Sequence, residues 1–201
     1  INSHLAKEDQ TTLENHLDFM HENKDLFFGL KFSAYETLDD TYNDKYEFVL
    51  PDLIVDKNLF SSKKYGSVDL LSNVKIHQYD TNKTKKHFIN DLDWESTKHY
   101  FLSGLNGQFL AKFKNINYKA DNIEYFKSET ANEVFGALGY LKKINLFKKI
   151  KNNSNQTLTP KMLLRYSPDY MRKESDKSVV SHNMDLFALD RLDKNDNFEG
   201  G

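Results

Sequence analysis

Cysteine is missing from this 201-residue sequence, and that absence removes several kinds of chemistry. Without thiols the chain has no disulfide framework, thiolate zinc site or cysteine nucleophile. Proline is also scarce, with 3 residues, of which Pro160 and Pro168 bracket one short segment. Proline lacks the N–H that a central strand donates to its neighbour, so it is expected at the entry or exit of a strand rather than inside it.

Long apolar runs and a strong net charge are absent as well. No stretch of about 18 apolar residues occurs, so the sequence contains no candidate transmembrane helix. The net charge of −2 gives no large basic field that would attract nucleic acid. A transmembrane β-barrel stays open, because its strands are about 10 residues long and only half apolar.

Aromatic residues supply much of the apolar content, with 15 Phe and 11 Tyr in a chain that is 38% hydrophobic. Disordered chains are poor in aromatic residues, so this chain is expected to be ordered. Polar and apolar residues alternate with a period of two in many segments, as in LFFGLKFSAYE at 26–36. That period indicates β-strands rather than helices.

The alternation predicts an all-β chain with no convincing helix. Connections between the strands are short, which requires antiparallel neighbours, so we expect one curved meander that pairs in sequence order. The predicted strands are Thr12–Glu22, Leu26–Thr37, Lys45–Lys57, Gly66–Tyr79, Lys86–Thr97, Tyr100–Asn115, Glu129–Tyr140 and Leu158–Ser167.

Two all-β architectures fit this pattern. Tight turns that alternate with longer polar loops are typical of outer-membrane barrels. A soluble antiparallel sandwich gives the same two-residue alternation. Periodicity alone leaves both architectures open.

Two segments near the C-terminus carry a more specific pattern, LTPKMLLRYSP at 158–168 and LFALDRLDKND at 186–196. Together they resemble the outer-membrane lipopolysaccharide-assembly family LptD, also called OstA or Imp, and the resemblance runs from about Lys45 onward. The matching positions are Leu158, Pro160, Lys161, Tyr166, Pro168, Leu186, Phe187, Asp190, Arg191 and Asp196. Members of the family often carry arginine after the second acidic residue, where this chain has Asn197, so a second charge pair is not expected.

The resemblance implies that residues 1–201 are one partial domain, an internal fragment of a transmembrane β-barrel in the outer membrane of a Gram-negative cell. The signal peptide, the periplasmic domain and the remaining strands, including the lipid gate, would lie outside this sequence. The implied function is non-enzymatic and needs no cofactor: the barrel helps to insert lipopolysaccharide into the outer leaflet. A soluble all-β binding module and a generic porin-like barrel are the alternative functions.

The resemblance also implies partners and two different faces. The partners would be lipopolysaccharide, outer-membrane lipid and periplasmic lipopolysaccharide-transport proteins, and an assembly lipoprotein in the lumen is compatible with it. Lipid-facing residues are expected at Leu26, Phe28, Leu30, Phe32, Val68, Leu70, Val74 and Ile76. Lumen-facing residues are expected at Lys31, Ser33, Asp69, Asn73 and Lys75.

No residue pattern predicts catalysis or metal binding. The 7 histidines include no pair at metal-ligand spacing with a third ligand. Asp91 and Asp93 are paired carboxylates of the kind that general acid–base chemistry uses. Their place in the alternating segment HFINDLDWE favours the polar face of a strand instead, and we expect them to line a wet lumen.

Overall fold

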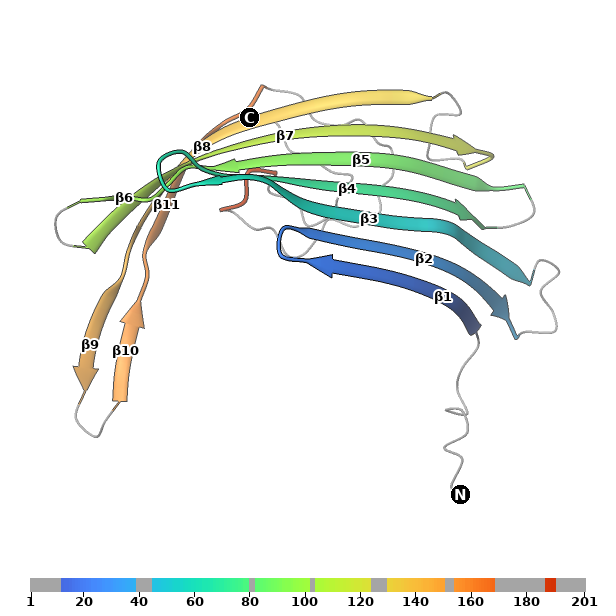
Figure 1. Ribbon diagram of the computed structural model, residues 1–201, viewed down its shortest axis with the longest axis horizontal. Coiled ribbons are helices and arrows are strands. Elements are labelled where there is room, and N and C mark those ends of the chain that lie inside the picture. The colour runs from blue at the N-terminus through green and yellow to red at the C-terminus, as the bar shows by residue number, and fades with distance from the viewer. Residues whose placement is uncertain are drawn as a thin grey trace, which may run out of the picture. The chain divides into compact units, whose positions relative to one another are not determined.

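The computed structural model describes residues 12–38, 45–79, 82–101, 104–123, 130–150, 154–168 and 187–190. In these ranges the chain is all-β, with one nine-stranded sheet and one separate pair of strands (Figure 1). None of the described residues belongs to a helix long and apolar enough to cross a membrane.

The main sheet is the antiparallel meander that the alternation predicts. Its order is β1-β2-β3-β4-β5-β7-β8-β11, and β6 pairs with β7. The pairing begins at β1 and ends at β11. The strands are β1 (Thr12–Asn23), β2 (Leu26–Thr37), β3 (Tyr46–Ser62), β4 (Gly66–Gln78), β5 (Thr84–Glu95), β6 (His99–Tyr100), β7 (Leu105–Asp121), β8 (Ala131–Ile144), β9 (Leu146–Ile150), β10 (Ser154–Leu158) and β11 (Lys161–Tyr166).

Several predicted boundaries were wrong. The third strand extends to Ser62 instead of ending at Lys57. The predicted strand Tyr100–Asn115 is divided into β6 and β7, and β7 continues to Asp121. Gly104 lies in the break with a φ of +77°, a left-handed conformation that glycine adopts readily and that reverses the chain. The hydrogen bond from Phe101 N to Leu105 O, 2.8 Å long, closes this turn.

The β9–β10 pair was not predicted, and it changes the reading of Pro160. β8 pairs with β11 from Leu138↔Tyr166 to Lys143↔Lys161, and β9 pairs with β10 from Leu146↔Leu158 onward in the same register. Between the two ladders, Ile144 N donates to Pro160 O at 3.2 Å. Pro160 has no N–H with which to continue the ladder, so one long hairpin is divided at this point and β11 starts at Lys161.

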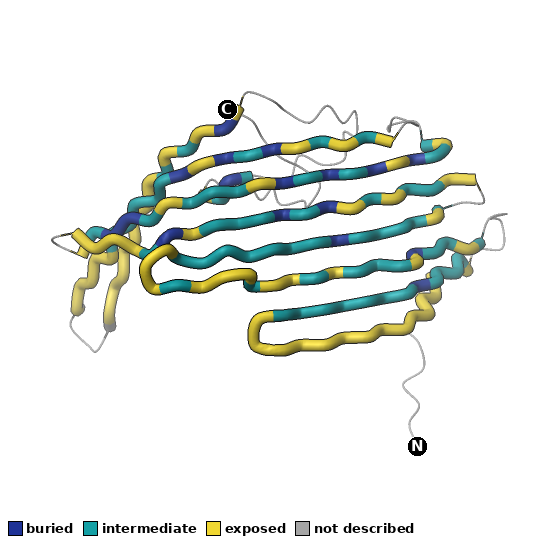
Figure 2. Tube along the Cα trace, turned by 45° about the horizontal axis from the view of Figure 1, so that its top comes forward, coloured by how far each residue is buried: buried dark blue, intermediate teal, exposed yellow. Residues whose placement is uncertain are grey.

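By its contacts the chain divides into two compact units that cut across the strands. Unit 1 comprises residues 1–56, 72–89 and 116–132, and unit 2 comprises residues 57–71, 90–115 and 133–201. Both units bury apolar and polar residues. The buried residues of unit 1 are mostly apolar, with two polar ones among them: Val49, Ile89, Ile116, Tyr118, Ala120, Ser33 and Asn73. Those of unit 2 are mostly polar: Asp91, Ser96, Asn106, Lys114, Ser167, Phe135, Ala137 and Leu189. Figure 2 shows the buried positions recurring along the central strands, whereas β1 is exposed along its whole length.

Candidate functional site

The two faces of the β1–β2 hairpin in unit 1 differ in chemistry. Residues paired across an antiparallel ladder lie on the same face, so Leu17 and Phe19 of β1 share a face with Phe32 and Leu30 of β2. The opposite face carries the pairs Glu14↔Tyr35, His16↔Ser33 and Asp18↔Lys31. The apolar face is open, since Leu17 is 55% exposed and Phe19 is 53% exposed, whereas Ser33 on the polar face is buried.

Ion pairs and hydrogen bonds connect the polar face of β1 and β2. Lys31 Nζ lies 2.7 Å from Glu14 Oε1, and the Tyr35 hydroxyl donates to the same oxygen at 3.2 Å. Both interactions join β1 to β2, and they hold Lys31 and Tyr35 beside Glu14. Surface pairs of this kind add little stability by themselves.

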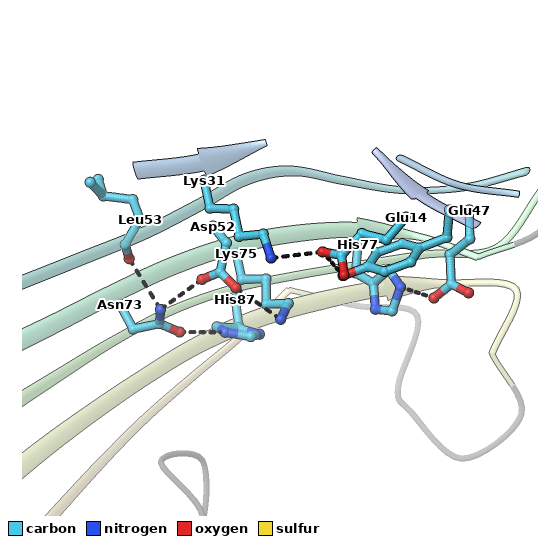
Figure 3. Close-up of polar contacts among 10 residues, drawn as sticks. Glu14, Lys31, Glu47, Asp52, Leu53, Asn73, Lys75, His77 and His87 are labelled. Atoms are coloured by element: carbon cyan, nitrogen blue, oxygen red, sulfur yellow. Dashed lines mark hydrogen bonds and ion pairs between the residues drawn. The ribbon is translucent and has the colours of Figure 1, made fainter. Parts of the chain in front are cut away.

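The same polar face continues through β3, β4 and β5. Asn73 Nδ2 donates to Asp52 Oδ1 at 3.3 Å and to Leu53 O at 3.1 Å, and Lys75 Nζ lies 3.0 Å from Asp52 Oδ2. His87 Nε2 lies 2.8 Å from Asn73 Oδ1. Figure 3 shows these side chains in a row, together with the contact between His77 and Glu47. Asn73 therefore links side chains from three successive strands.

The deepest charges of unit 2 form a cluster around Lys112 and Lys114 of β7, which we call the β7 charge cluster. Lys112 Nζ lies 3.0 Å from Asp93, 3.3 Å from Asp190 and 3.9 Å from Asp91. Lys114 Nζ lies 2.8 Å from Asp91 Oδ2, and the side chains of this pair are only 1% and 6% exposed. Burial removes the hydration of an ion, so these charges are tolerated only because each has an opposite charge beside it.

Both carboxylates that the sequence singles out lie in this cluster, paired with lysines. Asp91 and Asp93 both contact lysine, so each carboxylate is engaged as the anion of an ion pair. Asp91 Oδ1 is buried and makes no hydrogen bond to the described residues. In the same part of the chain, no group of three or more His, Cys, Asp or Glu side chains is placed to hold a metal ion. The cluster offers alternating fixed charges on a strand face, which suits a polar lining.

The segment Phe187–Asp190 packs against the same face of unit 2. Arg165 Nε of β11 donates to Leu189 O at 2.7 Å, and Asp190 joins the β7 charge cluster through Lys112. Leu189 is buried over Gly139 of β8, where an added Cβ would come within 2.7 Å of Leu189 Cδ2. Glycine at this position therefore makes the room in which the segment lies.

This packing brings together the two halves of the C-terminal sequence pattern. Lys161 Nζ of β11 lies 5.5 Å from the centre of the Phe187 ring, within the range of a cation–π contact. Two further matching positions, Leu158 and Tyr166, lie away from this contact. Leu158 is exposed in β10, and Tyr166 is exposed on the opposite face of β11. Leu186, Arg191 and Asp196 lie outside the described residues.

The outward apolar face of unit 2 contains a groove of about 470 Å³. Mostly ring and aliphatic side chains from β4, β5, β7, β8 and β11 line it, together with Pro168 and the side chain of Lys112. Its lining includes Val68, Leu92, Trp94, Phe113, Leu138 and Tyr166. Neighbouring positions of this face are open, since Leu138 is 59% exposed and Leu164 is 60% exposed. An apolar surface of this extent is uncommon on a soluble monomer.

The expected lipid-facing and lumen-facing sets do fall on opposite faces of their strands. Lys31, Asn73 and Lys75 make the polar contacts of unit 1, and Asp69 accepts a hydrogen bond from Asn58 at 2.6 Å in unit 2. Sequence reasoning missed four residues of the site, Lys112, Lys114, Arg165 and Leu189. Lys112 and Lys114 were detectable, because AKFKN places two cations on one face just as NDLDWE places two anions.

A comparison with known proteins finds no family model and no curated relative that matches this chain.

Proposed function

We propose that this chain forms part of the wall of an outer-membrane β-barrel of the LptD (OstA, Imp) type. In that role its apolar face lies against lipid, and its polar face lines the route by which lipopolysaccharide reaches the outer leaflet. No covalent step is involved. The sugars and phosphates of the lipid need a hydrophilic surface while its acyl chains need the membrane, and a wall with two such faces separates them.

One observation carries the membrane part of this proposal. In both units the face that carries the ion pairs also holds the buried residues, including apolar ones such as Ile116 and Phe135, whereas large apolar side chains on the opposite face are exposed. Exposed examples on the apolar face are Leu17, Phe19, Phe88, Phe109, Phe113, Val134, Leu138, Met162, Leu164 and Tyr166. A soluble sheet shows the reverse arrangement, because water drives the apolar face inward. Lipid removes that penalty, so the observed arrangement favours a membrane wall over a soluble binding module.

The assignment to lipopolysaccharide assembly has a separate support. The sequence pattern that resembles the family lies in two segments, and Lys161 and Phe187 from these segments are in contact. Asp190 of the second segment is bound to Lys112 of the sheet wall. A generic porin-like barrel gives no reason for these particular residues to meet. The proposal accordingly treats the Phe187–Asp190 segment as an anchor on the polar face.

Cysteine labelling at two adjacent positions tests the membrane part. Asp18 and Phe19 lie on opposite faces of β1, and both are accessible in the structure, with the Asp18 side chain 33% exposed and Phe19 53% exposed. In native membranes we expect Asp18→Cys to react with a water-soluble maleimide and Phe19→Cys to be protected by lipid. The chain has no other cysteine to interfere. Equal reaction at both positions in membranes, or faster reaction at Phe19→Cys, would contradict the lipid-facing assignment.

Depletion of the protein in its own cell separates lipopolysaccharide assembly from generic pore formation. We expect newly made lipopolysaccharide to stop appearing at the cell surface, as measured by antibody binding to intact cells after a metabolic pulse. A generic pore protein would leave that signal unchanged and alter only the uptake of small solutes. If surface lipopolysaccharide is unchanged while the cysteine labelling gives the expected result, the membrane wall is supported and the assembly role is rejected.

A further inference from the structure

The distribution of charge along the chain is strongly uneven around the β9–β10 hairpin. Residues 134–168 contain no aspartate or glutamate, although the whole chain carries 30 acidic residues. The same stretch holds seven basic residues: Lys142, Lys143, Lys148, Lys149, Lys151, Lys161 and Arg165. A local excess of this size is not explained by the net charge of −2 and indicates an anionic partner.

The described lysines of this stretch have no carboxylate partner, whereas several lysines elsewhere in the described sheet have one. Lys31, Lys75, Lys112, Lys114 and Lys119 each form an ion pair with a carboxylate. Within the described residues, no ion pair with a carboxylate involves Lys142, Lys143, Lys148, Lys149 or Lys161.

The register adds a second sign of an anionic ligand. Lys143 of β8 lies directly opposite Lys161 of β11 in the ladder. Like charges placed opposite each other on one face of a sheet repel and destabilise the pairing. A bound anion between or beside the two ammonium groups would remove that repulsion.

The hairpin also exposes apolar side chains beside its lysines. Phe147 is 77% exposed and Leu158 is 64% exposed. With Leu146, Lys148, Gln156 and Thr157 they line a groove of about 460 Å³. A free phosphate ion has no use for an apolar wall, and neither does a hydrophilic polyanion. The combination of cations and an apolar groove matches an amphiphile with an anionic head.

We propose that the β9–β10 hairpin, with the adjoining Lys142, Lys143 and Lys161, binds the phosphate headgroups of anionic phospholipid. The ammonium groups contact the phosphates, and Phe147, Leu146 and Leu158 contact the apolar part of the same lipid. This inference rests on the proposed function only in that the chain lies in a bilayer. It does not depend on lipopolysaccharide as the transported lipid. The hairpin would hold this part of the sheet at the membrane surface.

The test uses the whole protein reconstituted into lipid nanodiscs. Asn155 is exposed and lies opposite Lys149, so Asn155→Cys provides a site in the hairpin for an environment-sensitive fluorophore. We expect the emission of the fluorophore to rise and to shift to the blue as phosphatidylglycerol replaces phosphatidylcholine. High salt screens the charges, so the midpoint of this change should move to a higher fraction of phosphatidylglycerol. Each lysine near an anionic surface strengthens binding about fivefold, so Lys148→Gln with Lys149→Gln should weaken the response roughly 30-fold.

Three comparisons make the result decisive. The first comparison is Lys63→Gln with Lys64→Gln, which removes the same charge from the β3–β4 turn and should leave the midpoint unchanged. If this variant weakens the fluorophore response as much as the hairpin variant does, the attraction is unspecific and the hairpin is rejected as the site. Phe147→Ser keeps every charge and should weaken the response to lipid. Full competition by inorganic phosphate at constant ionic strength would show a simple anion site and overturn the phospholipid assignment.

The failure of this inference can be distinguished from failure of the proposed function. If the protein co-elutes with nanodiscs of both lipid compositions but the fluorophore responds equally to each, the hairpin does not bind anionic lipid and the membrane wall stands. If the protein does not enter nanodiscs of either composition, the membrane wall is rejected, and the inference falls with it.

Discussion

Gly66→Ala is expected to destabilise the protein by roughly 3–5 kcal/mol, a large part of the stability of an ordinary domain. Gly66 begins β4 with a φ of +90°, a conformation that an L-residue adopts only with strain. A Cβ at this position would also lie 2.7 Å from Ser96 Cα and 2.8 Å from Glu95 C. These are backbone atoms of the neighbouring segment and cannot rotate away, so the strand itself would have to move.

The turn before Gly66 cannot move freely to relieve that collision. The Trp94 indole donates to Tyr65 O at 3.0 Å, and the Thr97 hydroxyl donates to Lys64 O at 3.2 Å. These bonds hold the β3–β4 turn against the end of β5. Urea unfolding of the detergent-solubilised protein, followed by circular dichroism, measures the loss.

Gly104→Ala is the matched control for this prediction. Gly104 also has a positive φ, +77°, but nothing lies within 4 Å of its added Cβ. The Gly104→Ala variant should therefore lose only the free energy of unfolding that corresponds to backbone strain, roughly 1–2 kcal/mol. If both variants lose the same stability, the close approach of β4 to Glu95 and Ser96 does not constrain the sheet.

The tight hairpins of this fold were predictable because local chemistry fixes them. β2 has the predicted bounds Leu26–Thr37, and β1 ends one residue after its predicted end. The turn after β1 is fixed by Asn23, whose side chain accepts a hydrogen bond from Lys24 N at 2.7 Å. Once the turn is set, a one-residue slip would move Leu17 and Phe19 to the polar face, so the alternation admits a single register.

The β9–β10 hairpin was not predictable in the same way. Its sequence, NLFKKIKNNSNQTL, has adjacent apolar and adjacent basic residues, so no two-residue period marks the strands. These strands form because they continue the β8–β11 ladder across Pro160 in the same register. The register of that ladder is set by the pairing of residues 138–143 with residues 161–166. Strand formation imposed by a neighbour leaves little trace in local sequence.

The sequence predicted which residues of the candidate site lie on a polar face, but it did not predict which residues they contact. Alternation assigned Asp91 and Asp93 to a polar face, and the structure agrees. That Asp190 would meet Lys112 could not be read from spacing, because the contact joins two segments far apart in the chain. The room for it comes from Gly139, whose role depends on Leu189 lying above it.

The buried pair in the β7 charge cluster gives the second large prediction. Lys114→Met should destabilise the protein by about 3–5 kcal/mol, because it leaves Asp91 as a buried anion whose remaining cation, Lys112, is 3.9 Å away. The loss is measured by urea unfolding in detergent. Lys119→Met on the same strand is the control: its partner Asp121 lies at 3.5 Å and both side chains are more than 40% exposed, so the cost should stay below about 1 kcal/mol.

A double variant decides whether the cost comes from the unpaired charge. Lys114→Met with Asp91→Val removes both ions, and an apolar pair of similar volume in place of a buried ion pair is often neutral or stabilising. We therefore expect the double variant to be more stable than Lys114→Met alone, with a coupling energy of at least about 2 kcal/mol. Additive losses would show that Lys114 acts through packing of its aliphatic stem. In that case the β7 charge cluster would not explain why a lysine is fully buried in this sheet.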